Sequence, residues 1–552
     1  MKRNFLMVLM FVFMLSSILS ACSSNQANEV EPSGAANSPD SETAGADTNW
    51  DTFTPYKDKV TMTIGRQGVS GNNLPKGDTL ENNQFLKYVE DKLNVKINYE
   101  FSVDDGEAYK QKVNLAITST NVPDVMIVDE TQFKKLAEAG MLADLKEAYD
   151  KSASPLIKEY YDSFKGRVLD SVTIDGKLLA LPDTNLAGNH QLLWVRKDWL
   201  DKVGMQPPST MDEVTAVSKA FVDQKTGGDG TIGLTGDPIM YTDGAFFTFD
   251  PIFAAYGSFP QQWVKDASGN ITNGSIMPET KKALEKLREM YADGLIDKEF
   301  VTRKWNDNAA LVASGKAGMV FAPWFAGWML SDSVKNDKNA EWIPLSAPLG
   351  ENGKRNLLLS KPSGQYLVVH KGFEHPEAMV KALSVQYEGL RLKDESAKSL
   401  YEGLGVSWLN WPFNLQLNYE DAVYRDAEAL SDALAKHDSS NLSPDQMPKY
   451  DSLIIDEKAP KQDIANYANK LAFFTGAHEV GTDKLQKIES VFYGQTPSMF
   501  TKGTNLTKME SEMFLKIITG VESVDSFDKF VKSWKQLGGD DITKEVTAEV
   551  GN

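Results

Sequence analysis

Cysteine, histidine and positive charge are all scarce in this sequence. Its 552 residues include one cysteine and five histidines, and 58 basic residues face 77 acidic ones, which gives a formal net charge of −19. Because a strongly negative chain repels nucleic-acid phosphates, this balance argues against a nucleic-acid partner. No two histidines have the spacing that binds a metal from one helical turn; they are His190, His370, His375, His437 and His478.

The sequence also lacks the short motifs of several enzyme classes and any fold-length internal repeat. It contains no nucleophile elbow, no H-E-x-x-H pair and no phosphate-binding loop. Its apolar content of 41% and charged content of 24% are those of a soluble globular protein. The length predicts two or more folding units.

The amino terminus has the pattern of an export signal. Lys2 and Arg3 precede an apolar run at 5–15 and a small-residue segment at 16–21, so we expect residues 1–21 to be a signal peptide. The segment Leu19-Ser20-Ala21-Cys22 resembles the bacterial lipobox, which implies that Cys22 becomes a lipidated first residue. The alternative is an ordinary secretion signal that leaves an unexplained thiol. Loss of two basic residues with the signal gives a mature charge of −19 − 2 = −21.

A spacer follows the expected cleavage point. Residues 23–49 are rich in Ser, Ala, Asn, Gly and acidic residues and have no aromatic side chain before Trp50. Such a segment cannot bury enough apolar surface to fold, so we expect a flexible linker within 22–55. No transmembrane segment follows, and the expected location is the extracellular face of the bacterial cell membrane, held by a lipid anchor only.

The folded body begins with alternating strand and helix patterns. Strands are expected from Val60 and from Val95, with a helix over 83–93 between them, and a buried strand ends at Asp129. Such βαβ units predict a mostly parallel sheet with functional loops at the strand ends. Arg66 and Asp129 fall at such ends, where each is a candidate ligand contact or a local loop bond.

The stretch from Asn306 to Trp328 predicts a helix, a glycine turn at Gly315 and a strand buried on both faces. Pro323 must end that strand because it cannot continue the ladder. Trp324 and Trp328 therefore follow the carboxyl end of a strand, where open α/β sheets bind ligands. Either ring could instead be core.

Other aromatic and polar side chains extend the predicted binding wall. Sugar rings offer C–H patches that pack on aromatic faces and hydroxyls that need paired donors and acceptors. The candidates are Trp263, Trp305, Asp250 and Asn306, with Trp408 and Trp411 in an expected helical insertion at 391–475, where they either cap the site or plug the insertion into the body.

Three segments resemble a known family. The first is Arg196-Lys197-Asp198-Trp199-Leu200 with the Thr210 to Glu213 capping box, and the second is Gly315 to Trp324. The third and most specific is the tail, with Ile517-Ile518-Thr519-Gly520, Phe527 to Phe530, Trp534-Lys535 and Leu537-Gly538-Gly539. With the lipobox, they resemble extracellular solute-binding proteins of carbohydrate ABC transporters, in the LplA/LipO-like branch, over essentially the whole chain.

The resemblance implies a two-lobed α/β binding protein of the periplasmic-binding-protein type. Each lobe is a mostly parallel sheet flanked by helices, and the ligand lies in the cleft between them. Lobe 1 is expected at 56–186 plus about 343–390, and lobe 2 at 187–342 plus about 391–552 with the helical insertion. The family often has a calcium loop, but the matching stretch at 223–234 is one residue out of step and contains Lys225, so we expect no metal there or a weakly bound one. We expect no cofactor.

The sequence therefore predicts a monomeric binding protein that captures an oligosaccharide and delivers it to the permease subunits of an ABC importer. A neutral or mildly substituted sugar is favoured and a uronide stays open. The rival hypothesis is a surface-anchored glycoside hydrolase, which would need two facing carboxyls, one with a raised pKa. A purely structural surface protein, which needs no ligand cleft, is the third possibility.

Overall fold

The computed structural model describes residues 49–68, 74–184, 191–239, 246–402, 404, 406–481 and 485–551. The chain divides into two units, Met1–Ala46 and Asp47–Asn552, and the description that follows concerns the second. The expected signal peptide, Cys22 and nearly all of the spacer lie outside the described residues. Within the described ranges, no helix is both long enough and apolar enough to cross a membrane.

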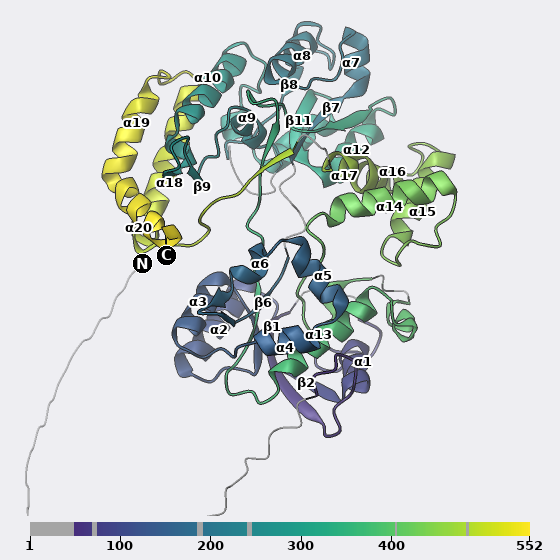
Figure 1. The fold of residues 1–552 in the computed structure, drawn as a ribbon. Helices are drawn as coiled ribbons and strands as arrows, with labels where there is room; N and C mark the ends of the chain where they lie inside the picture. Colours follow the sequence, from purple (N-terminus) through teal and green to yellow (C-terminus); the bar gives the residue numbers. More distant parts are fainter. Residues whose placement is uncertain are drawn as a thin grey trace, which may run out of the picture. The chain divides into compact units, whose positions relative to one another are not determined.

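The first of two main sheets has five strands in the order β2-β1-β3-β14-β6 (Figure 1). β1 runs parallel to β2 and β3, as the βαβ pattern predicted, and β14 runs antiparallel to β3 and β6. The strands are β1 (Val60–Gln67), β2 (Val95–Val103), β3 (Val125–Val128), β6 (Leu181–Pro182) and β14 (Tyr366–Val369).

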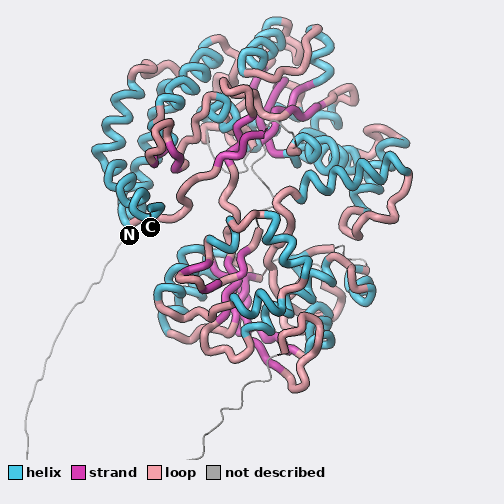
Figure 2. Tube along the Cα trace, viewed as in Figure 1, coloured by secondary structure: helices cyan, strands magenta, loops and turns pink. Residues whose placement is uncertain are grey.

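Helices flank this sheet (Figure 2). The helix predicted over 83–93 is present because the Asn83 side chain caps it, accepting hydrogen bonds from the backbone N–H groups of Phe85 and Leu86. A short hairpin turns at Asp175-Gly176 as expected, between β4 (Thr173–Ile174) and β5 (Lys177–Leu178). The helices are α1 (Gln84–Leu93), α2 (Gly106–Ser119), α3 (Glu130–Glu138), α4 (Lys146–Ser152), α5 (Pro155–Ser163), α6 (Arg167–Asp170) and α13 (Pro376–Leu390).

The second sheet has four strands in the order β12-β7-β11-β8. Its central strand β11 is buried at every residue and ends at Pro323, which confirms the prediction made for this stretch. The strands are β7 (Gln191–Arg196), β8 (Ile232–Leu234), β11 (Ala317–Pro323) and β12 (Trp342–Leu345). The helices around it are α7 (Lys197–Val203), α8 (Met211–Asp223), α9 (Asp250–Ala255), α10 (Pro278–Ala292), α11 (Trp305–Ala313) and α12 (Gly327–Asn336).

Both sheets are mixed, whereas the sequence predicted mostly parallel ones. In the second sheet only β8 and β11 pair in parallel, and β7 runs antiparallel to both β11 and β12. Within the described strands of these two sheets, each antiparallel pair includes β14 or β7, the strands that adjoin the segments connecting one sheet with the other. A strand that enters a sheet from such a connection lacks the βα crossover that makes neighbours parallel.

The carboxyl-terminal helices pack beside α10 (Figure 1, yellow). They contribute Phe514, Phe527, Phe530 and Trp534 to the core of the second sheet. These helices are α18 (Pro497–Ile518), α19 (Ser526–Trp534) and α20 (Asp540–Gly551), and two small strand pairs complete this part, β9 (Trp263–Lys265) with β10 (Ile271–Asn273) and β13 (Arg355–Leu358) with β15 (Leu485–Ile488).

The expected helical insertion is present and packs on the second sheet's helices. Tyr467 and Leu471 of the insertion share a core with Trp194 of β7 and Leu330 of α12. The insertion comprises α14 (Ala422–Lys436), α15 (Met447–Lys458), α16 (Ile464–Asn469), the π-helical turn η6 (Lys470–Gly476) and α17 (Ala477–Glu479).

The segment before the insertion belongs to the other core. Trp411, Phe413, Leu415 and Leu417 are buried with the side chains of the first sheet, although the expected boundaries assigned them to lobe 2. We therefore propose that lobe 1 extends to about residue 417, and we keep the other expected boundaries as proposals.

Helix α13 holds the start of the folded chain. Lys381 is fully buried, and its Nζ donates hydrogen bonds to the carbonyl oxygens of Asn49 at 3.1 Å and Thr54 at 2.8 Å. The same Nζ lies 4.5 Å from the ring centroid of Tyr56, whose hydroxyl donates to Glu377 at 2.9 Å. Burial lowers the pKa of Lys381 to about 8. We call residues 49–56 with Lys381 and Glu377 the amino-terminal clamp.

Candidate functional site

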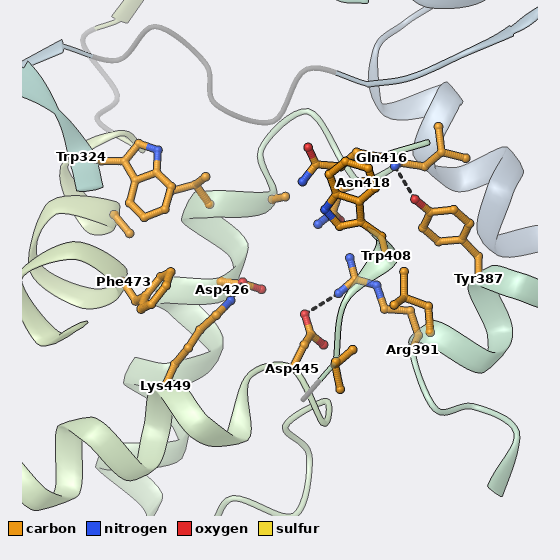
Figure 3. A pocket seen from close by; sticks show the side chains of 16 residues that line it. Trp324, Tyr387, Arg391, Trp408, Gln416, Asn418, Asp426, Asp445, Lys449 and Phe473 are labelled. Atoms are coloured by element: carbon orange, nitrogen blue, oxygen red, sulfur yellow. Dashed lines mark hydrogen bonds and ion pairs between the residues drawn. The ribbon is translucent and has the colours of Figure 1, made fainter. Parts of the chain in front are cut away.

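A pocket of about 360 Å³ is the candidate site (Figure 3). Its walls come from segments far apart in the sequence: the end of α13, the stretch before the insertion, the residue after β11, and the helices of the insertion. In Figure 3 Trp324 and Phe473 lie on one side, and Trp408 and Arg391 lie on the other. The lining residues are Trp324, Tyr387, Leu390, Arg391, Val406, Trp408, Gln416, Leu417, Asn418, Ala422, Val423, Asp426, Asp445, Lys449, Phe473 and Ala477.

The end of β11 fixes Trp324. Pro323 terminates the strand, its carbonyl oxygen accepts a hydrogen bond from Trp194 Nε1 at 3.1 Å, and the short helical turn η3 (Trp324–Ala326) starts at once. The Trp324 ring centroid lies 6.0 Å from that of Phe473, which the π-helical turn η6 positions. Two apolar ring faces therefore adjoin one wall of the pocket.

The opposite side offers amide groups on an ordered backbone. Thr184 holds the backbone of the segment that carries Gln416 and Asn418: its N–H donates to the Gln416 carbonyl at 2.9 Å, and its hydroxyl accepts from the Asn418 N–H at 2.8 Å. The buried Tyr387 hydroxyl donates to the Leu415 carbonyl at 2.7 Å and accepts from the Leu417 N–H at 2.5 Å. Side-chain amides provide both donors and acceptors, which ligand hydroxyls require.

Two ion pairs complete the lining. Arg391 Nη1 donates to Asp445 Oδ2 at 2.5 Å, and Lys449 Nζ donates to Asp426 Oδ2 at 2.5 Å. Burial disfavours the charged form of Arg391, but the neighbouring Asp445 carboxylate and Tyr160 hydroxyl outweigh it and raise the pKa of Arg391. Burial likewise opposes charge on Asp445, yet Arg391, Ser443 and Lys449 lower its pKa.

These charges do not form the acid pair of a glycoside hydrolase. Such an enzyme needs one carboxyl with a raised pKa that can donate a proton to the leaving group. The two carboxyls of the lining are Asp426 and Asp445. Asp445 has a lowered pKa, and both are bonded to cations.

Of the side chains expected at the site, the pocket brings together Trp324 and Trp408. Trp411 is fully buried in the first core, where its Nε1 donates to the Tyr401 hydroxyl at 2.7 Å. Arg66 is 1% exposed and donates to the carbonyl oxygens of Leu409, Trp411 and Pro412. Arg66 therefore supports the segment that carries Trp408 and does not itself line the pocket.

Four other expected residues have local roles in the structure. Asp129 caps α3 in a capping box with Gln132, and Trp263 is 5% exposed within the second core. Asp250 Oδ2 accepts from Gln191 Nε2 at 2.8 Å and from the Thr248 hydroxyl at 2.9 Å. Trp328 is 46% exposed and its Nε1 donates to Asn469 at 3.0 Å.

Trp305 and Asn306 open helix α11 on the surface. Trp305 is 48% exposed, and its ring centroid lies 6.1 Å from that of Phe246. The ring centroid of Phe246 is in turn 5.6 Å from that of Phe325, and the Phe325 centroid is 5.3 Å from that of Trp324. Trp305 therefore belongs to an aromatic row that leads away from Trp324, and neither Trp305 nor Asn306 is among the lining residues of the pocket.

Of the lining residues, only Trp324 and Trp408 were predicted. Those that were missed include the four charged ones, Arg391, Asp426, Asp445 and Lys449, and the aromatic Phe473. They come from the end of α13 and from four places in the insertion, so no short-range spacing connects them. The only sequence signal was the aromatic cluster of Trp408 and Trp411 beside Pro412. It indicated that the expected insertion could contribute to the site, but it did not show which of its residues face the pocket.

In the stretch at 223–234 that matches the family's calcium loop, lysine side chains bond to several of the oxygen atoms. Lys316 Nζ donates to the carbonyl oxygens of Gly227 and Asp229, each at 2.9 Å, and Lys225 Nζ lies 2.8 Å from Asp229 Oδ1. Among the residues described, no group of three or more His, Cys, Asp or Glu side chains is placed to hold a metal ion. The expectation that this loop binds no metal, or binds one weakly, stays a prediction.

The sequence profile of one protein family, described as "Bacterial extracellular solute-binding protein", matches residues 72–384, more than half of the 552-residue chain. The chain belongs to this family. This confirms the family suggested by the sequence motifs, and it confirms a binding protein over the enzyme alternative.

Two relatives are similar to this chain over most of their length. Lipoprotein LipO of Bacillus subtilis (strain 168) is 24% identical over 460 residues, which cover 80% of this solute-binding protein and 83% of LipO. The polygalacturonan/rhamnogalacturonan-binding protein YtcQ of the same organism is 24% identical over 472 residues, which cover 83% and 86% of the two chains. The match to LipO supports the LipO-like branch.

A solved structure supports the fold. The crystal structure of an extracellular solute-binding protein from Bifidobacterium longum subsp. infantis superposes with a TM-score of 0.59 at 18% identity, over 90% of this chain and 99% of that one. The two-lobed α/β fold expected for this solute-binding protein is therefore confirmed.

Proposed function

We propose that this protein captures an oligosaccharide in the pocket between Trp324 and Trp408 and delivers it to the permease subunits of an ABC importer. The observation that carries the proposal is the composition of the pocket: the aromatic rings of Trp324, Phe473 and Trp408 alternate with amide and charged groups. Apolar faces pack on the C–H patches of sugar rings, and the polar groups pair with the hydroxyls.

The size of the pocket and the relatives support the same class of ligand. A cavity of about 360 Å³ lies within the range of roughly 300–1,000 Å³ that is typical of small-molecule sites. The name of YtcQ states a carbohydrate ligand for that protein. The aromatic row of the partly buried Phe325 and Phe246 and the exposed Trp305 continues from Trp324, so we favour more than one sugar unit.

A thermal-shift screen tests this function. We expect at least one oligosaccharide to raise the melting temperature, because a ligand at one hundred times its Kd stabilises the folded state by about 2.7 kcal/mol. The screen should include amino acids, short peptides and divalent metal ions as competing classes. Stabilisation by one of those classes and by no saccharide would contradict the proposal.

We further propose that Cys22 is lipidated and tethers a monomer to the extracellular face of the membrane. The lipobox-like segment before Cys22 and the lipoprotein LipO as a relative support this. Replacing Cys22 with alanine should then move the protein from the membrane fraction to the medium, because one lipid anchor is the only attachment. Immunoblots of the two fractions give the measurement, and retention of the variant on membranes would overturn the anchor.

A further inference from the structure

The charged groups of the pocket are already paired with one another. The described lining contains two cations, Arg391 and Lys449, and two carboxylates, Asp445 and Asp426. Each cation lies 2.5 Å from its carboxylate, and the four side chains are only 18–25% exposed. No charge in the described part of the lining is left without an opposite partner in contact.

Neighbouring residues hold both pairs in place. The Tyr160 hydroxyl lies 3.0 Å from Arg391 Nε, and the Ser443 hydroxyl donates to Asp445 Oδ1 at 2.7 Å. Asp426 Oδ1 accepts a hydrogen bond from Gln446 Nε2 at 2.8 Å. A ligand that separated a carboxylate from its cation would break these bonds as well.

The other contacts of the pocket's charged groups, and its neutral amides, also leave no cation of the described lining free for a ligand. Besides its ion pair with Asp426, Lys449 makes a cation–π contact: its Nζ lies 5.0 Å from the ring centroid of Phe473. The raised pKa of Arg391 and the lowered pKa of Asp445 keep both ionised around neutral pH. Gln416 and Asn418 add neutral amides.

We infer that this pocket selects uncharged oligosaccharides and discriminates against uronides, a conclusion that rests on the proposed sugar-binding function. A sugar hydroxyl can donate to Asp426 or Asp445 and accept from Arg391 or Lys449 without disturbing either pair. A ligand carboxylate would find both cations neutralised and would approach two fixed carboxylates, so it would be repelled. The ligand class thus differs from that in the name of YtcQ, since galacturonan is a uronic acid polymer.

Calorimetric titration of the purified protein tests this selectivity. The probes are oligogalacturonides, the same chains after carboxyl reduction, alginate oligosaccharides, and gluco-, xylo-, galacto- and fructo-oligosaccharides of matched length. We expect the tightest ligand to be neutral and every uronide to bind at least about tenfold more weakly, the factor that one hydrogen bond to a charged group supplies. A uronide that binds as tightly as the best neutral sugar would overturn the inference.

A charge-unmasking variant tests the cause. Replacing Asp426 and Asp445 together by asparagine keeps the side-chain shape but frees both cations, so affinity for uronides relative to neutral sugars should rise on the order of tenfold. The matched control replaces Asp91 and Asp201 by asparagine; both form exposed ion pairs with lysines outside the pocket lining, and the net charge changes equally. The control should leave the ratio within about twofold, because distant exposed charges are screened.

Each outcome bears on a different conclusion. An equal rise in both double variants, or no rise in either, would overturn the role of the pocket charges. The single variants Asp426→Asn and Asp445→Asn supply the same test if the double variant does not fold. If no saccharide of any kind binds, the proposed function itself fails, and the selectivity with it.

Discussion

Replacing Trp324 with alanine should weaken oligosaccharide binding by roughly 1–3 kcal/mol, the free energy of covering one large apolar face. This corresponds to a Kd raised roughly 5- to 150-fold. The ring is held in place before the ligand arrives, since Pro323 ends a buried strand directly in front of it and Phe473 lies beside it. A preformed wall loses little conformational entropy on binding, so removing the ring should lose most of the free energy that its contact with the ligand contributes. Calorimetry and a thermal melt on the same variant give the two quantities.

Trp328 provides the matched control. It lies four residues further along, is 46% exposed and is not among the lining residues. Trp328→Ala should therefore leave the affinity nearly unchanged. If Trp324→Ala instead lowered the melting temperature strongly while the surviving folded protein bound as before, Trp324 would be a core residue and the proposed wall would be wrong.

Replacing Trp411 with alanine should have the larger effect on stability, a loss of roughly 3–5 kcal/mol in the free energy of unfolding. The side chain is fully buried, and its ring centroid lies 5.4 Å from Phe85 and 5.5 Å from Tyr88. Truncation would leave a cavity and would deprive the buried Tyr401 hydroxyl of its donor. Because native domains are stabilised by only about 5–15 kcal/mol, chemical denaturation should detect the loss easily.

Trp408, three residues earlier, is the control for Trp411. Its side chain is partly exposed and lines the pocket, so Trp408→Ala should reduce affinity and cost less stability than Trp411→Ala. The reverse pattern, with binding lost and stability kept in Trp411→Ala, would return Trp411 to the site that the sequence suggested for it.

Local patterns predicted most of the elements. The helix capped by Asn83, the hairpin at Asp175-Gly176 and the strand ended by Pro323 each depend on a few neighbouring residues, and all three are present. Whether neighbouring strands run parallel or antiparallel was harder to predict from the sequence. It depends on how the chain passes between the sheets, and the apolar pattern of a buried strand is the same whether its neighbour is parallel or antiparallel.

The site could be predicted only in part for the same reason. Trp324 could be predicted because Pro323 marks the end of a buried strand in the sequence, and Trp324 is the next residue. Trp408 and Trp411 have the same residue type and stand three residues apart, yet one lines the pocket and the other is core. Trp411 packs on Phe85 and Tyr88, and its carbonyl group accepts a hydrogen bond from Arg66, a residue 345 positions earlier. No window of local sequence contains that contact.

The amino-terminal clamp has a mechanical meaning if the chain is tethered through residues that precede it. Tension on the chain would pass through Asn49 and Thr54 into Lys381, so the load would be borne by α13. This helix has 15 residues and is roughly 22 Å long, and Arg391 follows its last turn at the pocket. One rigid rod would thus connect the point of suspension with the binding site. Under the proposed anchor, the part of the protein that carries α13 would therefore be the part attached most directly to the membrane.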